Sequence, residues 1–432
     1  MGHAQLPDYR DPCGWNALLP KRLPRPQAMG VMRAKYVVIG AGYTGLAAAR
    51  RLHELDPGQS ILVLEGSEIG EGSSARNSGF MTPRDSKIDL SLSEMPRAER
   101  INAFCEEGFD YLKTIMTAGG FDADLIRSGR VTAAATDLGS QKIRSMHEGA
   151  QAHGFAHHYL KREDLKAFIG TDYYQCGLRI EEGYLMQPAK LIRGLADSLP
   201  DPITLYENTI VREVQPSDRG ATWQVMTQEA NITADIVIFA TNAAIKQFGH
   251  WRDRLVTIYT YAALTAAMDS RDAAHLGDPV WGVLPAHRLG TTVRRVDHNR
   301  LMVRSLYAYE KPLAPQAVQH ALTGCFERRY PMLKHVSLEH VWGGTTALTM
   351  NGSPLWGAIK QGLYASAGCN GSGVVKGTLL GKRLAEMIVT GDPQEALQSV
   401  YGRANWIAPE PFRTLGFHLV SAIERRKADL EM

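Results

Sequence analysis

Three glycines and one glutamate in the first part of the chain have the types and spacing needed to hold a dinucleotide. Gly40, Gly42 and Gly45 match the pattern G-x-G-x-x-G, and Glu65 follows twenty residues after the last of them. In this pattern the first glycine allows a tight turn, the second lets the backbone approach a pyrophosphate, and the third lets a helix pack closely on a strand. A carboxylate at Glu65 can accept hydrogen bonds from ribose hydroxyls and disfavours the 2′-phosphate of NADP. The motif by itself fits both NAD and FAD.

A strand, a turn, a helix and a second strand are the elements that must hold these residues. The apolar, β-branched run at 36–39 predicts a buried parallel strand directly before the first glycine. Apolar residues then recur at helical spacing over 46–55, and a second apolar run at 61–64 ends at Glu65. The helix N-terminus offers unpaired N–H groups and a positive dipole end to phosphates. The sequence therefore predicts a complete dinucleotide-binding unit at 36–65.

A second group of polar residues follows the acid, in the stretch GSSARNSGFM at 72–81. Ser73 and Ser74 can donate hydrogen bonds to phosphate or ribityl oxygens, and Arg76 can balance negative charge or stack on a ring. Glycines and short side chains let such a loop approach the edge of a flat ring. The alternative is a solvated loop with an exposed arginine.

Near the C-terminus the chain repeats the pattern of strand, glycine-rich turn and helix. The run at 362–367 leads into Gly368, Gly371 and Gly373, and apolar residues recur at helical spacing over 375–388. This turn lies about 330 residues after the first. NAD alone needs no second turn of this kind, whereas a longer ligand needs N–H donors at both of its ends. The pair of turns favours FAD.

With these motifs in place, the chain resembles the FAD-dependent amine and amino-acid oxidases of the D-amino-acid oxidase, glycine oxidase and sarcosine oxidase superfamily. Within it, the chain is most similar to the branch typified by γ-glutamylputrescine oxidoreductase. The stretches that carry the resemblance span nearly the whole chain and are GWNALLPKRLPRP, GEGSSARNSGF, IFATNAA, VWGGTTALTMNGSPLWG and SAGCNGSGVVKG. The resemblance implies an α/β fold in which a Rossmann-like FAD-binding domain is interleaved with a substrate domain built on a mixed or antiparallel β-sheet.

The resemblance also assigns residues to the coenzyme. Val211 would contact the adenine through its backbone, and the residues from Gly371 to Val374 would meet the pyrimidine edge of the flavin ring. Binding is expected to be non-covalent, because 342–346 holds no cysteine and Cys369 does not stand at the family's attachment position. The residues expected to bind FAD are Gly40, Gly42, Tyr43, Thr44, Gly45, Glu65, Gly66, Gly72, Ser73, Ser74, Arg76, Asn77, Ser78, Gly79, Val211, Ala240, Thr241, Asn242, Gly343, Gly371, Ser372, Gly373 and Val374.

The chain departs from the family's pattern at several positions. Asn351 stands where the family usually has Asp, and Ser372 where many members have His. Ala75 and Ser78 replace glycines of the signature loop. Val375 occupies the position where members similar to sarcosine oxidase place a lysine for the substrate carboxylate. This last departure disfavours a simple N-methylglycine substrate and leaves a neutral or larger amine open.

Catalytic residues are harder to identify, because oxidation of a C–N bond by a flavin depends mostly on positioning the substrate. Arg294 aligns with an arginine in the family's sheet segment and can bind a carboxylate or assist oxygen reduction, with a surface salt bridge as the alternative. Tyr259 and Tyr261 alternate with Thr260, so both tyrosines would share one side of a strand, where ordinary packing is the alternative. Arg294 and Tyr259 are the catalytic candidates.

The pass along the chain predicts two interleaved domains with a segment at each end. A leader covers 1–33 and a C-terminal docking segment covers 396–432, whose helix from Gly416 would turn one apolar face to the protein. Runs at 255–268, 291–296 and 299–305 predict strands of the substrate sheet. The FAD-binding domain is expected at 34–110, 185–250 and 340–395, and the substrate domain at 111–184 and 251–339.

Composition limits the class of protein further. The 432 residues are 44% hydrophobic and 22% charged with a net charge of +3, which argues against nucleic acid or an acidic membrane surface as the main partner. Five scattered cysteines predict free thiols and a cytoplasmic protein, and no apolar run is long enough to predict a membrane span. The adjacent His157 and His158 have no further ligand at suitable spacing, so no metal site is expected. Homo-oligomerisation is left open.

The leading hypothesis is an FAD-dependent enzyme that oxidises a C–N bond of a small-molecule amine or amino acid. The imine product would be hydrolysed, and oxygen is the expected electron acceptor, giving H2O2. The alternatives are a flavin dehydrogenase that passes electrons to a quinone or a carrier protein, an NAD-linked dehydrogenase, and a non-catalytic flavoprotein subunit. The sequence does not name the substrate.

Overall fold

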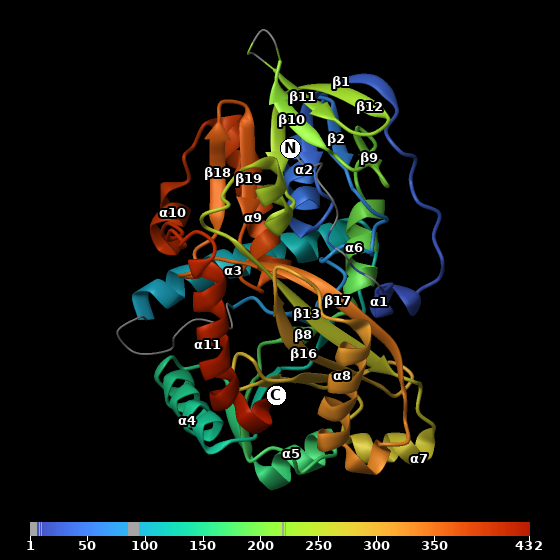
Figure 1. The fold of residues 1–432 in the computed structure, drawn as a ribbon, viewed down its shortest axis with the longest axis vertical. Coiled ribbons are helices and arrows are strands. Elements are labelled where there is room, and N and C mark those ends of the chain that lie inside the picture. Colours follow the sequence, from blue (N-terminus) through green and yellow to red (C-terminus); the bar gives the residue numbers. More distant parts are fainter. Residues whose placement is uncertain (1–6, 8, 10, 85–94, 218–219, 221) are drawn as a thin grey trace.

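Two large β-sheets organise the chain, and helices cover them (Figure 1). The computed structural model describes residues 7, 9, 11–84, 95–217, 220 and 222–432. Within these residues the two large sheets have eight strands each, and a third sheet has three. The strands of the first sheet come from three separate stretches of the chain, with the strands of the second sheet between them in sequence. The predicted α/β fold with interleaved parts is confirmed.

The first sheet has a parallel centre, as the buried apolar runs predict. In the order β19, β12, β1, β2 and β9, each strand pairs in parallel with the next. All four residues of β2 are buried, because helices and neighbouring strands cover both of its faces. Two antiparallel pairs, β10–β11 and β18–β19, extend the sheet on the side of β12 that faces away from β1. The strands are β1 (Gly30–Ile39), β2 (Ile61–Leu64), β9 (Ile203–Tyr206), β10 (Glu213–Pro216), β11 (Trp223–Met226), β12 (Ala230–Phe239), β18 (Leu355–Lys360) and β19 (Leu363–Ala367).

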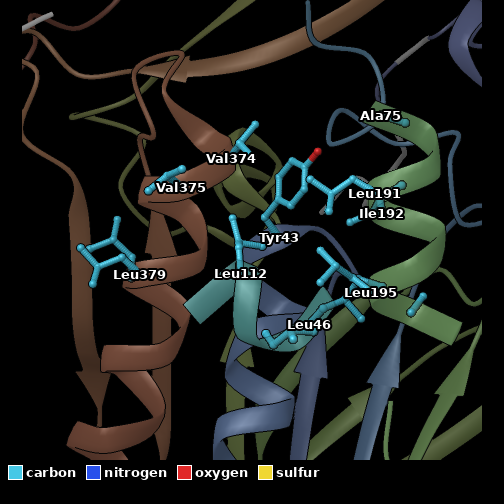
Figure 2. Packing of buried hydrophobic residues seen from close by; sticks show 14 of the residues in the cluster. Tyr43, Leu46, Ala75, Leu112, Leu191, Ile192, Leu195, Val374, Val375 and Leu379 are labelled. Carbon is cyan, nitrogen blue, oxygen red and sulfur yellow. The ribbon is translucent and has the colours of Figure 1, made fainter. Parts of the chain in front are cut away.

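The helices after the two glycine-rich turns lie side by side on this sheet. Helix α2 (Tyr43–Leu55) follows β1, and α9 (Gly373–Thr390) follows β19. A Cβ atom at Gly381 would collide with the carbonyl oxygen of Thr44, so only glycine permits this close crossing. Figure 2 shows Tyr43 and Leu46 of α2 among apolar side chains of α9, α3 (Met95–Ala118) and α6 (Pro188–Asp197). The two turns are therefore held in one fixed arrangement.

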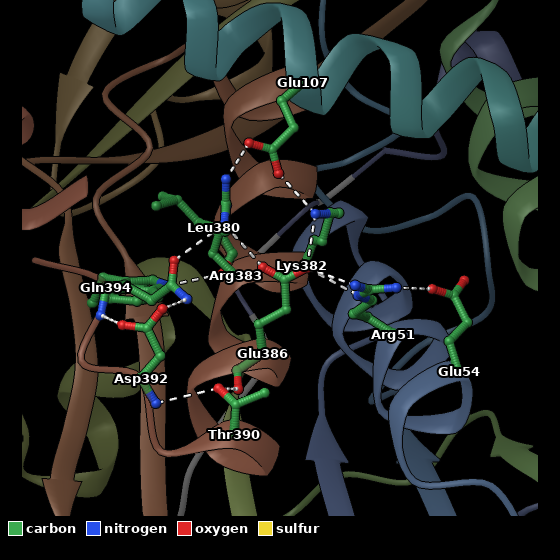
Figure 3. Close-up of polar contacts among 11 residues, drawn as sticks. Arg51, Glu54, Glu107, Leu380, Lys382, Arg383, Glu386, Thr390, Asp392 and Gln394 are labelled. Atoms are coloured by element: carbon green, nitrogen blue, oxygen red, sulfur yellow. Dashed lines mark hydrogen bonds and ion pairs between the residues drawn. The ribbon is translucent and has the colours of Figure 1, made fainter. Parts of the chain in front are cut away.

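An ionic network also ties α2, α3 and α9 together (Figure 3). Glu386 of α9 accepts hydrogen bonds from Lys382 at 2.8 Å and from Arg51 of α2 at 3.0 Å. Lys382 also reaches Glu107 of α3 at 2.7 Å, and Arg383 pairs with both acids. Although burial of Glu386 acts against its charged form, the hydrogen bond from Lys382 and the positive charges of Lys382, Arg383 and Arg51 outweigh this effect and lower its pKa.

The second sheet is mixed, in agreement with the prediction. Its order is β17, β13, β16, β15, β14, β5, β7 and β6, and only the β14–β5 pair is parallel among the pairs within the described residues. Helix α8 (Pro315–Arg329) packs on one face of it. The strands are β5 (Arg130–Ala134), β6 (His157–Lys161), β7 (Cys176–Ile180), β13 (Val256–Thr265), β14 (Gly282–Pro285), β15 (Thr292–Val296), β16 (Arg300–Tyr309) and β17 (Leu338–Leu348).

Several elements are longer than the apolar runs that predicted them. Strand β1 begins at Gly30, and β16 continues to Tyr309, beyond the run at 299–305. The C-terminal helix α11 (Phe412–Ala428) begins before Gly416 and docks by stacking Phe417 on Tyr309, with ring centroids 4.5 Å apart. Strand partners and docking surfaces, which local sequence does not specify, account for these extensions.

The remaining elements connect the sheets or cover their ends. The proposed division into domain segments stays a prediction, and β17, which begins at Leu338, pairs with β13 of the second sheet. The remaining elements are α1 (Gly14–Ala17), β3 (Phe80–Met81), β4 (Ile126–Arg127), α4 (Asp137–Ala152), α5 (Arg162–Ile169), β8 (Tyr184–Leu185), η2 (Asn242–Phe248), α7 (Ser270–Ala273), η3 (Ala274–Leu276), η4 (Pro331–Leu333), α10 (Glu395–Tyr401) and η5 (Asp429–Glu431).

Candidate functional site

One cavity of about 2020 Å³ contains both glycine-rich turns and part of the second sheet in its lining. Ligand pockets for small molecules usually measure about 300–1,000 Å³. The cavity therefore has room for a dinucleotide and a second, smaller molecule. Its walls come from the ends of β1, β2, β12 and β19, from the loop at 72–78, from β13 to β17, and from α4 and α11.

The first glycine-rich turn lies at the end of β1 as predicted. Gly40 has φ +103°, a conformation that side chains rarely adopt, and a Cβ atom there would lie 2.8 Å from the carbonyl oxygen of Ala240. Gly42 caps α2 without a side-chain hydrogen bond, so N–H groups of the first turn face the cavity. Gly45 is not in the lining and instead lets α2 pack against the turn, since a Cβ atom there would collide with the carbonyl oxygen of Gly40. These placements match the three roles expected of the motif.

Glu65 lies at the end of β2, with its carboxylate turned toward the first turn. Its Oε2 accepts a hydrogen bond from the N–H of Ala41 at 2.9 Å, and its Oε1 accepts from the N–H of Ser67 at 3.1 Å. Burial raises the pKa of Glu65, and these hydrogen bonds act in the opposite direction. The carboxylate is thus held in the cavity wall beside the start of α2, where a ribose would be expected.

The loop at 72–78 crosses the cavity beside the start of α2. Ser74 Oγ accepts a hydrogen bond from the N–H of Tyr43 at 3.3 Å, and Tyr43 itself lines the cavity. Asn77 folds the loop on itself by donating to the carbonyl oxygen of Ser74 at 2.7 Å and accepting from the N–H of Gly79 at 2.8 Å. Gly66, Gly72, Ser73 and Ser78 lie in the lining as well, whereas Gly79 does not.

Four of the five N–H groups of Arg76 donate to protein partners, which the sequence did not indicate. Its guanidinium pairs with Glu71 at 2.9 Å and donates to the carbonyl oxygen of Gly343 at 2.9 Å. It also lies over the ring of Tyr9, 4.4 Å from the ring centroid, and Tyr9 contributes to the lining. Tyr9 is a site residue that sequence analysis missed, because nothing local in the leader marks it. Gly343 is outside the lining and supports Arg76 through its backbone.

The second glycine-rich turn, after β19, lies in the wall of the same cavity. Gly371, Ser372, Gly373 and Val374 all line it, and Ser372 caps α9 without a side-chain hydrogen bond. Asn242 connects this turn to the end of β12, since its Oδ1 accepts from the N–H of Gly368 at 3.1 Å. Two turns that are far apart in the sequence therefore open into one space.

The end of β12 and the segment before β10 complete this wall. Ala240, Thr241, Asn242 and Val211 lie in the lining, as expected. Thr241 Oγ1 is buried and has no hydrogen-bond partner among the described residues. A buried hydroxyl of this kind is costly unless a ligand or water satisfies it, so the site has a polar group available for a bound molecule.

Tyr259 lies on the opposite face of β13 from the cavity. It is buried in the apolar cluster with Tyr261, whereas Ile258 and Thr260 line the cavity. The two tyrosines do share one side of the strand, as predicted, but that side packs toward α8. Period-two alternation shows which residues share a face and does not show which face meets the ligand.

Arg294 also lies outside the cavity lining. Its Nη1 donates to the carbonyl oxygens of Met186 at 2.6 Å, Gly79 at 3.2 Å and Ser78 at 3.3 Å, and its guanidinium lies over the ring of Trp15. Burial lowers the pKa of Arg294 to about 10. This geometry makes Arg294 a support that joins β15 to the loop at 72–79, in place of the surface salt bridge or the substrate contact considered from the sequence.

Charged residues that sequence analysis missed line the part of the cavity between the second sheet, α4 and α11. Arg304 and Tyr307 come from β16, Lys142 from α4 and Arg425 from α11. Burial lowers the pKa of Lys142, whose Nζ donates to the carbonyl oxygen of Ala286 at 2.7 Å. No motif marks these positions, because they come together only through the packing of separate elements.

In the part of the chain that the structure describes, no group of three or more His, Cys, Asp or Glu residues is arranged to hold a metal ion. No described helix combines the length and apolar character that crossing a bilayer requires. The five cysteines are free thiols, and Cys369 beside the second turn lies 3.5 Å from Thr346 Oγ1 and 3.6 Å from Asn242 Nδ2.

Comparison with known proteins agrees with this geometry. Residues 35–387 match the family DAO, described as FAD dependent oxidoreductase. The chain is 26% identical over 394 residues to probable oxidoreductase OrdL of Haemophilus influenzae, covering 87% of this chain and 89% of that protein. It is 26% identical over 359 residues to gamma-glutamylputrescine oxidoreductase of Escherichia coli, covering 81% and 82%.

Solved structures show the same fold. Glycine oxidase from Geobacillus kaustophilus superimposes with a TM-score of 0.72 at 16% identity, over 87% of this chain and 100% of that one. At this identity the likeness concerns the fold alone.

Proposed function

Because the chain belongs to the family of FAD-dependent oxidoreductases, we propose that it oxidises a C–N bond of a small-molecule amine or amino acid. The observation that carries the proposal is that the N-termini of α2 and α9, whose N-cap residues make no side-chain capping hydrogen bond, open into one cavity with Glu65 and the loop at 72–78. The motifs that resemble amine and amino-acid oxidases, and the relative named for γ-glutamylputrescine, support an amine as substrate.

The residues present fit FAD. The first turn of α2 offers N–H groups for the pyrophosphate, and Glu65 offers a carboxylate for the ribose. Thr241 Oγ1, buried without a partner among the described residues, can donate to or accept from the coenzyme. The first turn of α9 would lie at the flavin end, where its positive dipole end favours negative charge on the ring.

When bound, FAD supplies an acceptor for the hydride that leaves the carbon next to nitrogen, and the resulting imine is then hydrolysed by water. The protein itself positions the substrate and keeps water away from the reacting atoms. Ile258, Thr260 and Leu348 of the second sheet line the cavity and can hold the substrate carbon while limiting access of water. We propose oxygen as the electron acceptor, giving H2O2. A quinone or carrier protein is the alternative.

The first experiment asks whether the purified protein is yellow and shows flavin absorption. Anaerobic addition of polyamines, γ-glutamyl amines, N-methyl amino acids and D-amino acids should then bleach the flavin with at least one of them. A colourless protein would favour the NAD-linked alternative, and a flavin that stays oxidised with all amines would favour a non-catalytic subunit. Peroxide formed on admission of air separates oxygen from other acceptors.

Non-covalent attachment has its own test. Cys369 is the cavity-lining cysteine at the second turn, and its sulfur faces Thr346 and Asn242. We propose that it forms no bond to the coenzyme. Acid precipitation should therefore leave all of the yellow colour in the supernatant, whereas colour retained in the pellet would show covalent flavin.

A further inference from the structure

The wall that the second sheet gives to the cavity contains one arginine in the middle of a central strand. Arg304 of β16 lies between Ala262 of β13 and Thr292 of β15, and it lines the cavity together with Thr292. Its side chain is half-buried. A cation in this place has lost part of its hydration, so its charge has to be balanced by something within reach.

A strained bulge brings Tyr307 to the same face as Arg304. In the pairing of β13 with β16, Tyr261 faces Ser305 and Thr260 faces Tyr307, so Leu306 is an extra residue without a cross-strand partner. Leu306 has φ +64°, which is a rare conformation for a bulky residue. Without the bulge, residue 306 and not 307 would follow Arg304 on the cavity face, because successive side chains alternate.

The two side chains form a defined pair. Arg304 Nη1 donates to Tyr307 Oη at 2.8 Å, and the guanidinium carbon lies 5.1 Å from the tyrosine ring centroid. Tyr307 Oη in turn donates to the carbonyl oxygen of Arg288 at 2.9 Å. Tyr307 therefore has both hydrogen-bonding roles filled and holds Arg304 in one orientation. Most of the five N–H groups of Arg304 remain for a ligand.

Arg304 has no carboxylate partner within the described part of the chain. Lys142 and Arg425 likewise form no ion pair there and donate to the carbonyl oxygens of Ala286 and Tyr307, whereas Arg288 pairs with Glu424 at 2.8 Å. Basic residues also outnumber acids in the part of the lining that comes from α4, α11 and the strands beside them. The charged residues that line the cavity there are Lys142, Arg288, Arg304 and Arg425 against Glu148 and Glu424.

From the bulge, the oriented guanidinium and this charge balance, we propose that Arg304 binds a carboxylate of the substrate and that Tyr307 is its positioning residue. The substrate is then an amine that carries a carboxylate, and a purely cationic polyamine is disfavoured. This inference rests on the proposed function and names the substrate class. It assigns the carboxylate to β16, since Val375 stands at the position of the lysine that other members use and Arg294 is engaged by carbonyl groups.

The test compares matched substrates on the purified holoenzyme. Each amino acid or N-substituted amino acid that reduces the flavin is paired with its amide, and stopped-flow reduction gives the apparent affinity and the limiting rate separately. Wild-type protein should prefer the carboxylate over the amide by about 100-fold or more in kcat/KM. Arg304→Gln should raise KM for the carboxylate by about 100-fold, change the limiting rate little, and leave the amide almost unaffected.

Two further variants separate binding from general damage. Tyr307→Phe should raise KM for the carboxylate about 3- to 10-fold, because it removes one hydrogen bond to Arg304. Arg300→Gln is the matched control, because Arg300 lies on the same strand outside the cavity lining and pairs with Glu339.

A ligand titration gives a readout that does not depend on turnover. Acetate and succinate, added to the oxidised holoenzyme, should shift the flavin absorption spectrum in wild type and at least tenfold more weakly in Arg304→Gln. Equal loss of carboxylate and amide oxidation in Arg304→Gln, or a wild-type preference for polyamines, would overturn the inference and leave the proposed function standing. If no amine reduces the flavin, the proposed function fails, and equal carboxylate titrations in the two proteins would then overturn the inference independently.

Discussion

On one side of the cavity the groups available to a ligand are backbone N–H groups at the starts of α2 and α9, whereas on the side of the second sheet they are side chains of β13, β15 and β16. The first side depends on glycines that permit close approach of the backbone, as at Gly40 and Gly381. The second depends on which face of a strand a side chain occupies. The side with the glycine-rich turns can thus be recognised from local sequence motifs. The side formed by the second sheet can be recognised only from the three-dimensional structure.

The largest expected effect is on FAD binding and comes from a substitution in the first glycine-rich turn. Gly40→Val should force an unfavourable positive φ and a collision with Ala240, at a cost of about 3 kcal/mol. That cost corresponds to roughly 100-fold weaker FAD binding, measured as the flavin-to-protein ratio after gel filtration and by flavin titration. Gly58→Val is the control, because Gly58 also has positive φ, at +85°, with open space around it. If Gly40→Val retained full flavin, the first turn would not hold the coenzyme as proposed.

The next prediction tests whether Arg294 of the second sheet stabilises the fold or contacts the substrate. Arg294→Gln should remove hydrogen bonds to three carbonyl oxygens and lower the free energy of unfolding by about 2–4 kcal/mol. In the flavin-saturated protein, kcat should change by less than about threefold. Urea unfolding and steady-state rates measure the two quantities. Normal stability together with a large loss of kcat would instead make Arg294 a catalytic residue.

A smaller effect tests the ionic network of Figure 3, which holds α2 and α9 together. Glu386→Gln should lower the free energy of unfolding at pH 7 by about 1–3 kcal/mol. Since the pKa of Glu386 in the folded protein is lowered, its contribution is present above the unfolded-state value of about 4.3 and is lost as pH falls through the folded-state pKa. The difference between variant and wild type should therefore shrink below about pH 4.

The control for this prediction lies in the same network. Glu54 pairs with Arg51 at 2.8 Å, but its side chain is 35% exposed, so Glu54→Gln should cost only about 0.2–1 kcal/mol. Urea unfolding of the holoenzyme at pH 7 and below about pH 4 compares Glu386→Gln with Glu54→Gln. Equal losses in the two variants would mean that burial of Glu386 does not matter.

The smallest expected effect concerns strand parity. Tyr259→Phe should leave kcat/KM within about twofold of wild type, because the tyrosine lies on the face of β13 turned away from the cavity. Thr260→Val, one residue along, should change KM, since Thr260 lines the cavity. Stopped-flow reduction of the flavin measures both. A large loss in Tyr259→Phe would restore the catalytic role considered from the sequence.

The coenzyme side was predictable because its signals are local. The strand, turn, helix and acid from Tyr36 to Glu65 occupy one short stretch, and the structure contains them nearly as expected. The substrate side was not, because alternation leaves two faces open and does not show which face lines the cavity. Tyr259 and Arg294, the two catalytic candidates, lie outside the lining. The bulge at Leu306 changes which side chains of β16 face the cavity, and no residue type in this stretch predicts the bulge.

Tyr9 was missed for a related reason. It reaches the cavity through contacts with Thr345 and Arg76, which are far away in sequence. A proline-rich leader without regular apolar spacing gives no periodic signal that would predict such packing.

The close crossing of α2 and α9 has a consequence for how the protein is made. Gly381 and Thr44 touch in the finished molecule, yet more than three hundred residues separate them on the chain. At typical synthesis rates of about 5–20 residues per second, the early turn waits tens of seconds on the ribosome for its partner. Until then the cavity has only one of its two glycine-rich turns, so the complete binding site forms only after residue 381 has been synthesised.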